Sequence, residues 1–167
     1  MSKLVLFNHG KDSEPWGEKV LALAEIAKQQ GYEVDSLDYR STNDPTKRVE
    51  MILAYDFSAY DEVILVGSSM GSYVATVASE TIKPKGIFLM APAFYLEGYP
   101  QTEFNPPSKN TFVIHGWQDD VVPPANVWRF SQQHHCRLRM LEGDHRLTAV
   151  LNEVCEEFKH FIIRLGN

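Results

Sequence analysis

The chain has 167 residues, of which 44% are hydrophobic, so it is long enough for one domain with a proper core and too short for two ordinary ones. The formal net charge is −6, and the longest basic run is the pair Lys47 and Arg48, which argues against a nucleic-acid partner. No apolar stretch approaches the roughly 20 residues of a membrane span, and the first residues lack the apolar core of a signal peptide, so we expect neither feature. We therefore expect one soluble cytoplasmic domain, residues 1–167, with no membrane partner.

The two cysteines, Cys136 and Cys155, follow neither a C-x-x-C spacing nor a histidine-rich pattern. This argues against a zinc site and against a disulfide framework, and it favours free thiols. Nothing in the chain resembles a phosphate-binding glycine loop or a cluster of metal ligands. We expect no cofactor and no metal.

Strand-like and helix-like segments alternate from the start of the chain. Residues 3–8 are an apolar run that predicts a buried strand. A helix is expected to follow, with Pro15 in its first turn, Trp16 on its buried stripe and Gly31 at its end. Residues 32–39 predict a second strand, which several acidic residues place at an edge of the sheet.

The middle of the chain continues this alternation. Asn43-Asp44-Pro45 is a helix-start signal, and a buried stripe follows it, made of Val49, Ile52, Leu53 and Phe57. After the pattern at 61–82, which is treated below, residues 86–90 predict a fourth strand. Residues 93–110 fit no period and contain several aromatic and proline residues. A loop of this length is typical of a lid, although a solvated excursion with locally packed aromatics fits equally well.

The last third predicts two more strands and two more helices. The strands are residues 111–115 and 136–141, and a helix begins near Pro124 between them. From Leu147 to Leu165, apolar residues recur with the strongest helical period in the chain. The whole alternation predicts an α/β fold, a three-layer sandwich with a parallel sheet of about six strands and helices on both faces.

The most informative pattern lies within residues 61–82. An apolar run at 63–66 predicts a strand buried on both faces, and an amphipathic helix is expected after Gly71. Between them, Gly67-Ser68-Ser69-Met70-Gly71 is a G-x-S-x-G pentapeptide. Strand, tight turn and helix in this order predict a nucleophile elbow that exposes Ser69. A plain turn rich in small residues is the alternative.

Three residues that could take part in catalysis follow predicted strands, in the order Ser69, Asp119 and His145. This is the chain order of the alpha/beta-hydrolases. The chain resembles that superfamily from its first strand to its last helix, most of all the small single-domain bacterial serine esterases. The resemblance rests on four motifs, which are HG at His9-Gly10, GSSMGS at the elbow, HGWQDDVVP at 115–123 and GDH at 143–145.

The resemblance implies a minimal alpha/beta-hydrolase fold and a serine, histidine and aspartate triad. Ser69 is then the nucleophile and His145 its base, because the pKa of an imidazole suits proton transfer near pH 7. Asp119 orients the histidine, since it stands four residues before Pro123 as in the D-x-x-V-P pattern of the family. A shift of one residue would give that role to Asp120 instead.

The resemblance also suggests the groups around the triad. The backbone N–H groups of Met70 and Lys11 are expected to form the oxyanion hole. His9 and His115 are expected to organise their loops rather than to react. Trp117 and Tyr95 are candidates to bind substrate, although Trp117 suits a core position equally well.

We therefore expect a serine hydrolase that cleaves small or short-chain carboxylic esters through an acyl-enzyme, with a small-molecule ester as its partner. A thioesterase or an acyltransferase would use the same triad. An interaction module with an idle triad is the alternative from a different class, because a fold does not guarantee activity. The oligomeric state stays open.

Overall fold

The computed structural model describes all 167 residues, apart from the side chain of Ser108. Six strands form one sheet in the order β2-β1-β3-β4-β5-β6, and every neighbouring pair is parallel. This confirms the predicted parallel sheet of about six strands, with residues 33–37 at one edge. The strands are β1 (Lys3–Asn8), β2 (Glu33–Leu37), β3 (Glu62–Ser68), β4 (Gly86–Met90), β5 (Thr111–Gly116) and β6 (Arg137–Leu141).

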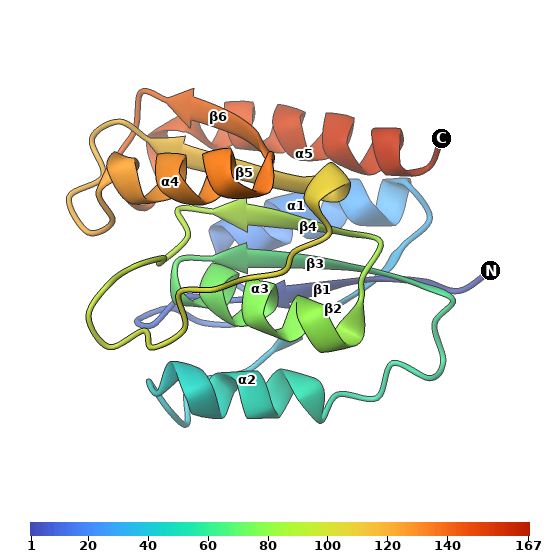
Figure 1. The fold of residues 1–167 in the computed structure, drawn as a ribbon. Coiled ribbons are helices and arrows are strands. Elements are labelled where there is room, and N and C mark those ends of the chain that lie inside the picture. Colours follow the sequence, from blue (N-terminus) through green and yellow to red (C-terminus); the bar gives the residue numbers. More distant parts are fainter.

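Helices cover both faces of the sheet, as expected for a three-layer sandwich. Helices α2, α3 and α4 lie on one face, and α1 and α5 lie on the other (Figure 1). None of the helices among the described residues is long and apolar enough to cross a membrane. The helices are α1 (Glu18–Gln29), α2 (Pro45–Leu53), α3 (Met70–Ile82), α4 (Pro124–His134) and α5 (Leu151–Leu165), with the short 3₁₀ turns η1 (Ser108–Asn110) and η2 (Thr148–Val150).

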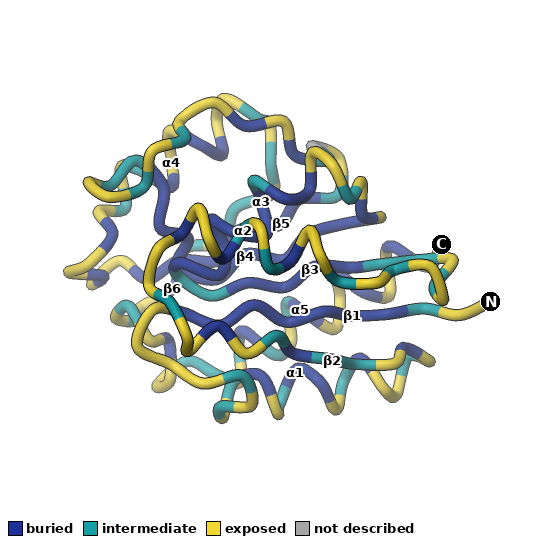
Figure 2. The backbone as a smooth tube through the Cα atoms, turned by 90° about the horizontal axis from the view of Figure 1, so that it is seen from below, coloured by how far each residue is buried: buried dark blue, intermediate teal, exposed yellow. Residues whose placement is uncertain are grey.

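The core consists of two hydrophobic clusters, one on each face of the sheet. The interior strand β1 is buried almost throughout, whereas its neighbour β2, at the edge of the sheet, is only partly covered (Figure 2). On the face of α1 and α5, Phe88 packs against Phe158 and Phe161 at ring-centroid distances of 5.1 and 5.4 Å. The predicted stripe of α5 is therefore buried, although the helix begins at Leu151 and not at Leu147.

The start of the first helix differs from the prediction. Helix α1 begins at Glu18 after Gly17, which makes no side-chain cap, and Pro15 lies in a turn ahead of it. The Ser36 hydroxyl donates a hydrogen bond to the carbonyl oxygen of Pro15 and so holds this turn against the neighbouring strand. Trp16 is consequently 40% exposed and does not belong to the buried stripe.

The second helix begins as predicted but buries a different face. The Asp44 carboxylate accepts a hydrogen bond from the backbone N–H of Thr46, which is an ordinary N-cap. Helix α2 ends at Leu53, whose side chain is 43% exposed, so the expected stripe does not continue to Phe57. The fully buried side chain next to Ile52 on this helix is Arg48.

The segment between β4 and η1 lies against α3 and α4. The ring of Phe94 is buried and stacks on Phe130 of α4 at a centroid distance of 4.1 Å. The Tyr73 hydroxyl of α3 accepts a hydrogen bond from the backbone N–H of Gln101. The aromatic residues of this segment therefore pack locally, as one of the two expectations from the sequence described.

Candidate active site

Ser69 sits on a strained turn between β3 and α3. Its φ is 53° and its ψ is −116°, a positive-φ conformation that a non-glycine residue adopts only at a cost. The turn is held by a hydrogen bond of 2.9 Å from the Ser69 N–H to the carbonyl oxygen of Met90. A Cβ at Gly71 would lie 1.9 Å from the carbonyl oxygen of Asn8, so only glycine permits this approach of α3 to β1. These are the features of a nucleophile elbow.

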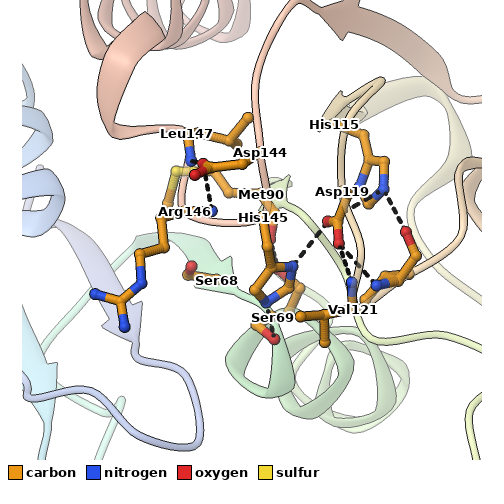
Figure 3. A network of polar contacts seen from close by, with 12 residues as sticks. Ser68, Ser69, Met90, His115, Asp119, Val121, Asp144, His145, Arg146 and Leu147 are labelled. Atoms are coloured by element: carbon orange, nitrogen blue, oxygen red, sulfur yellow. Dashed lines mark hydrogen bonds and ion pairs between the residues drawn. The ribbon is translucent and has the colours of Figure 1, made fainter.

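The structure brings Ser69, Asp119 and His145 into one hydrogen-bonded chain (Figure 3). His145 Nε2 lies 2.9 Å from Ser69 Oγ, and His145 Nδ1 lies 2.8 Å from Asp119 Oδ2. Strand β3 is separated from β6 by β4 and β5 in the sheet. The loop that follows β6 must therefore cross the ends of two strands to carry His145 to the serine.

Asp119, and not Asp120, faces the histidine. Asp119 is only 7% exposed, and its Oδ1 accepts hydrogen bonds of 2.8 Å from the backbone N–H groups of Val121 and Val122. Burial opposes ionisation of Asp119, but the hydrogen bonds from His145 and from the two N–H groups outweigh it and lower the pKa. A carboxylate at this position stays charged and fixes the Nδ1–H tautomer of His145. The side chain of Asp120 is exposed.

The end of β5 also carries the buried His115. Its Nε2 donates a hydrogen bond of 3.0 Å to the carbonyl oxygen of Val122 and lies 3.3 Å from Asp119 Oδ2. Burial is the main cause that lowers the pKa of His115, so the ring is neutral near pH 7. His115 thus braces the loop that presents Asp119, in the organising role that the sequence predicts.

His9 occupies a comparable place in the loop after β1. Its Nδ1–H donates to the carbonyl oxygen of Gly10 at 2.8 Å, and its Nε2 accepts the backbone N–H of Tyr39 at 2.9 Å. These two partners fix a single neutral tautomer, and burial lowers the pKa of His9. Both ring nitrogens therefore bond backbone groups, one in the loop after β1 and one just after β2, which again fits an organising role.

Arg48 is a residue of this site that the sequence analysis did not single out. Its fully buried guanidinium donates to the carbonyl oxygens of His9, Gly10 and Lys11 at 3.3, 3.2 and 3.4 Å. It also donates to the carbonyl oxygen of Thr42 at 2.8 Å. Three successive carbonyls of the β1–α1 loop thus point toward one cation. The sequence does contain one indication of its burial. Arg48 stands four residues before Ile52, which places it on the buried face of an amphipathic helix.

The two expected oxyanion donors lie on segments that flank Ser69. Met70 is the first residue of α3, so its N–H has no acceptor within the helix. The loop after β1 passes beside the serine, since a Cβ at Gly10 would lie 3.5 Å from the Cβ of Ser69. Lys11 follows directly, and its carbonyl is one of those that Arg48 fixes.

The two expected substrate-binding residues have different surroundings. Trp117 is 56% exposed, so it is not a core residue and its ring is open to contact at the carboxyl end of β5. The ring of Tyr95 instead packs 3.8 Å below the guanidinium carbon of Arg129 and against Phe104, with its hydroxyl buried. This packing supports the β4–β5 segment, and a contact of Tyr95 with substrate stays a prediction.

Other features of the surface lie away from this chemistry. A cavity of about 450 Å³ opens at the opposite end of the sheet, next to Met1, Tyr60 and Lys85. Among the residues that the structure describes, no group of three or more histidine, cysteine, aspartate or glutamate side chains is placed to hold a metal ion. The cysteines Cys136 and Cys155 are free thiols, as expected.

Residues 4–138 match the model of the Uncharacterised protein family UPF0227. The chain belongs to the UPF0227 family. No curated protein matches the chain.

Several solved structures share the architecture of this UPF0227 member. A protein of the alpha/beta hydrolase superfamily from Xanthomonas campestris pv. campestris is 26% identical, with a TM-score of 0.88 and coverage of 98% of this chain and 99% of the other. An alpha/beta serine hydrolase without lid from Xanthomonas campestris is 18% identical, with a TM-score of 0.75 and coverage of 97% and 81%. Est1E from Butyrivibrio proteoclasticus is 16% identical, with a TM-score of 0.75 and coverage of 98% and 88%. These likenesses confirm the predicted alpha/beta-hydrolase fold.

Proposed function

We propose that this protein is a serine hydrolase that cleaves small or short-chain carboxylic esters through an acyl-enzyme. One observation carries the proposal. Ser69 Oγ, His145 and Asp119 are joined by hydrogen bonds of 2.9 and 2.8 Å, and the serine stands on a strained elbow at the carboxyl end of β3. Acyl transfer needs a serine whose proton can leave to an oriented base, and this arrangement supplies both.

In the first half-reaction, Ser69 Oγ attacks the ester carbonyl while His145 Nε2 takes the hydroxyl proton. Asp119 holds the Nδ1–H of the imidazole and stabilises the imidazolium that forms. The negative charge on the carbonyl oxygen is received by the N–H groups of Met70 and Lys11. The tetrahedral intermediate then collapses as His145 passes its proton to the departing alcohol.

In the second half-reaction, water replaces the alcohol. His145 removes a proton from the water as it attacks the acyl-enzyme, and the same two N–H groups receive the oxyanion again. His145 then returns a proton to Ser69 Oγ and the acid leaves. The two half-reactions consume only ester and water, and we propose that they need no cofactor.

Two further considerations support an esterase acting on small acyl groups. Structural relatives of this chain include Est1E and the esterase Pf2001 from Pyrococcus furiosus. The segment at 93–110 leaves room for only a short lid. The buried aromatic ring of Phe94 packs part of it against α4, so little of it is available to cover a long acyl chain. We therefore expect an open site that binds only the first few carbons of an acyl group well.

The test is a panel of 4-nitrophenyl esters of increasing acyl length, assayed on the wild type and on Ser69→Ala. We expect kcat/KM to be highest for the short esters and to be lost in Ser69→Ala. The matched control is Ser131→Ala, because Ser131 is buried in α4 and its hydroxyl has no hydrogen-bond partner among the described residues. Wild-type rates in Ser69→Ala would refute the mechanism. Turnover that rises steadily to long-chain esters would refute the size preference.

A further inference from the structure

Lys19, in the first turn of α1, joins the two loops that carry the proposed nucleophile and base. Its ammonium donates a hydrogen bond of 3.2 Å to the hydroxyl of Ser68, the residue before Ser69. It donates a second hydrogen bond of 2.8 Å to the carbonyl oxygen of Arg146, the residue after His145. One side chain from a third segment thus spans the gap between the elbow and the loop after β6 that carries His145, which we call the histidine loop.

The histidine loop needs an anchor at this point. On the side of β5, the loop is fixed by backbone hydrogen bonds of 2.9 and 3.0 Å, which run from Trp117 and Gln118 to the carbonyl oxygens of Leu141 and Gly143. His145 itself lies beyond these bonds, where the loop has crossed toward β3. On this far side, the ammonium of Lys19 holds the carbonyl that immediately follows the histidine.

The placement of this ammonium is costly, which argues against a role in stability alone. Lys19 is half-buried, and none of the ion pairs among the described residues includes it. Burial, together with the nearby charge of Arg146, lowers its pKa to about 8, whereas the charge of Asp144 acts in the opposite direction. A cation without an ionic partner in a partly dry site is rarely a net source of stability.

We propose that Lys19 is a positioning residue, whose ammonium holds the Ser69 elbow and the His145 loop at the separation that proton transfer requires. The inference rests on the proposed hydrolase function and adds a residue that acts through Ser68 and Arg146. Lys19 touches neither the reacting serine hydroxyl nor the imidazole. Its effect is on the distance between them.

The decisive variant is Lys19→Met, which keeps the length and apolar stem of the side chain and removes the ammonium. We expect kcat on a short ester, and the rate of fluorophosphonate labelling, to fall about 10-fold or more while KM changes less than about twofold. The melting temperature should stay equal to the wild type or rise, because the unpaired charge is gone. The matched control is Lys28→Met, which removes an exposed lysine from the last turn of the same helix and should leave all three quantities unchanged.

Ser68→Ala provides a second, milder test, because it removes only the elbow side of the link. We expect kcat to fall less in Ser68→Ala than in Lys19→Met. The double variant, Lys19→Met with Ser68→Ala, should have a kcat little below that of Lys19→Met alone. Wild-type labelling rates in folded Lys19→Met would overturn the inference. A fall in kcat that appears only together with a lower melting temperature would overturn it too, since the role would then be structural. If Ser69→Ala itself retained activity, the failure would lie in the proposed function instead.

Discussion

Replacing Asp119 with asparagine tests the electrostatic arrangement of the site without changing its shape. Asp119 Oδ1 accepts two backbone N–H groups at 2.8 Å, and Oδ2 accepts the Nδ1–H of His145 at 2.8 Å. An asparagine amide has only one oxygen. That oxygen will take the position of Oδ1, because the opposite orientation would set an NH₂ group against two N–H donors.

The NH₂ group of the introduced amide will then face His145 Nδ1. Since NH₂ only donates, Nδ1 must become the acceptor, and the ring proton must move to Nε2. An imidazole with its proton on Nε2 cannot accept the proton of Ser69. The expected loss in kcat is about 10⁴-fold at neutral pH, which corresponds to about 5 kcal/mol in the barrier.

The assay is steady-state hydrolysis of a short 4-nitrophenyl ester, with circular dichroism to verify the fold. The matched control is Asp120→Asn, which changes the neighbouring exposed carboxylate and should stay within about twofold of the wild type. Retention of more than about a tenth of the activity in Asp119→Asn would refute the reasoning. So would a large loss in Asp120→Asn, because the orienting carboxylate would then be the other aspartate.

Three further predictions concern the supports of the site. In Gly71→Ala, the added Cβ would lie 1.9 Å from the backbone oxygen of Asn8, so we expect a loss of more than about 3 kcal/mol in urea unfolding. Gly17→Ala, whose Cβ would meet nothing closer than 4.0 Å, is its control, and equal stability of the two would contradict the packing argument. Arg48→Met leaves three loop carbonyls without their donor, so we expect a loss of about 3 kcal/mol in stability and a clear fall in kcat. Unchanged kcat in the folded variant would show that the loop does not depend on the guanidinium. The pKa of Lys19 is about 8 in the folded chain and 10.5 ordinarily, so the unfolded chain binds more protons between these values, and stability should rise with pH across that window by up to about 3 kcal/mol. In urea titrations at pH 7 and pH 10, the free energy of unfolding of Lys19→Met should lack this rise. An equal rise in both proteins would contradict the lowered pKa of Lys19.

The fold could be predicted from local patterns, because the strands and helices have recognisable hydrophobic patterns in the sequence. The apolar run of β3 and the regular stripe of α5 are both visible without any knowledge of their partners. The motif at Ser69 and the chain order of the three candidate residues could also be read, since strand ends in a parallel sheet meet at one edge. Each of these motifs lies within a short stretch of the sequence.

The hydrogen-bond partners of Lys19 and Arg48 could not be identified in that way, although the spacing of Arg48 from Ile52 indicated its burial. Each of these two side chains donates hydrogen bonds to backbone carbonyl oxygens. Every residue has such a carbonyl, so the sequence does not indicate which side chain it accepts a hydrogen bond from. The exposure of Trp16 is hidden from the sequence for a related reason. A hydrogen bond joins the turn at Pro15 to the distant Ser36, α1 begins only after this turn, and no local sequence pattern predicts that contact.

The most direct test of the central claim is to locate a fluorophosphonate adduct on the folded protein by tandem mass spectrometry. The account predicts one phosphonyl group per chain, attached to Ser69, and no labelling of Ser69→Ala. A folded wild type that takes up no label, or an adduct on Ser68 or Ser72 instead, would contradict it.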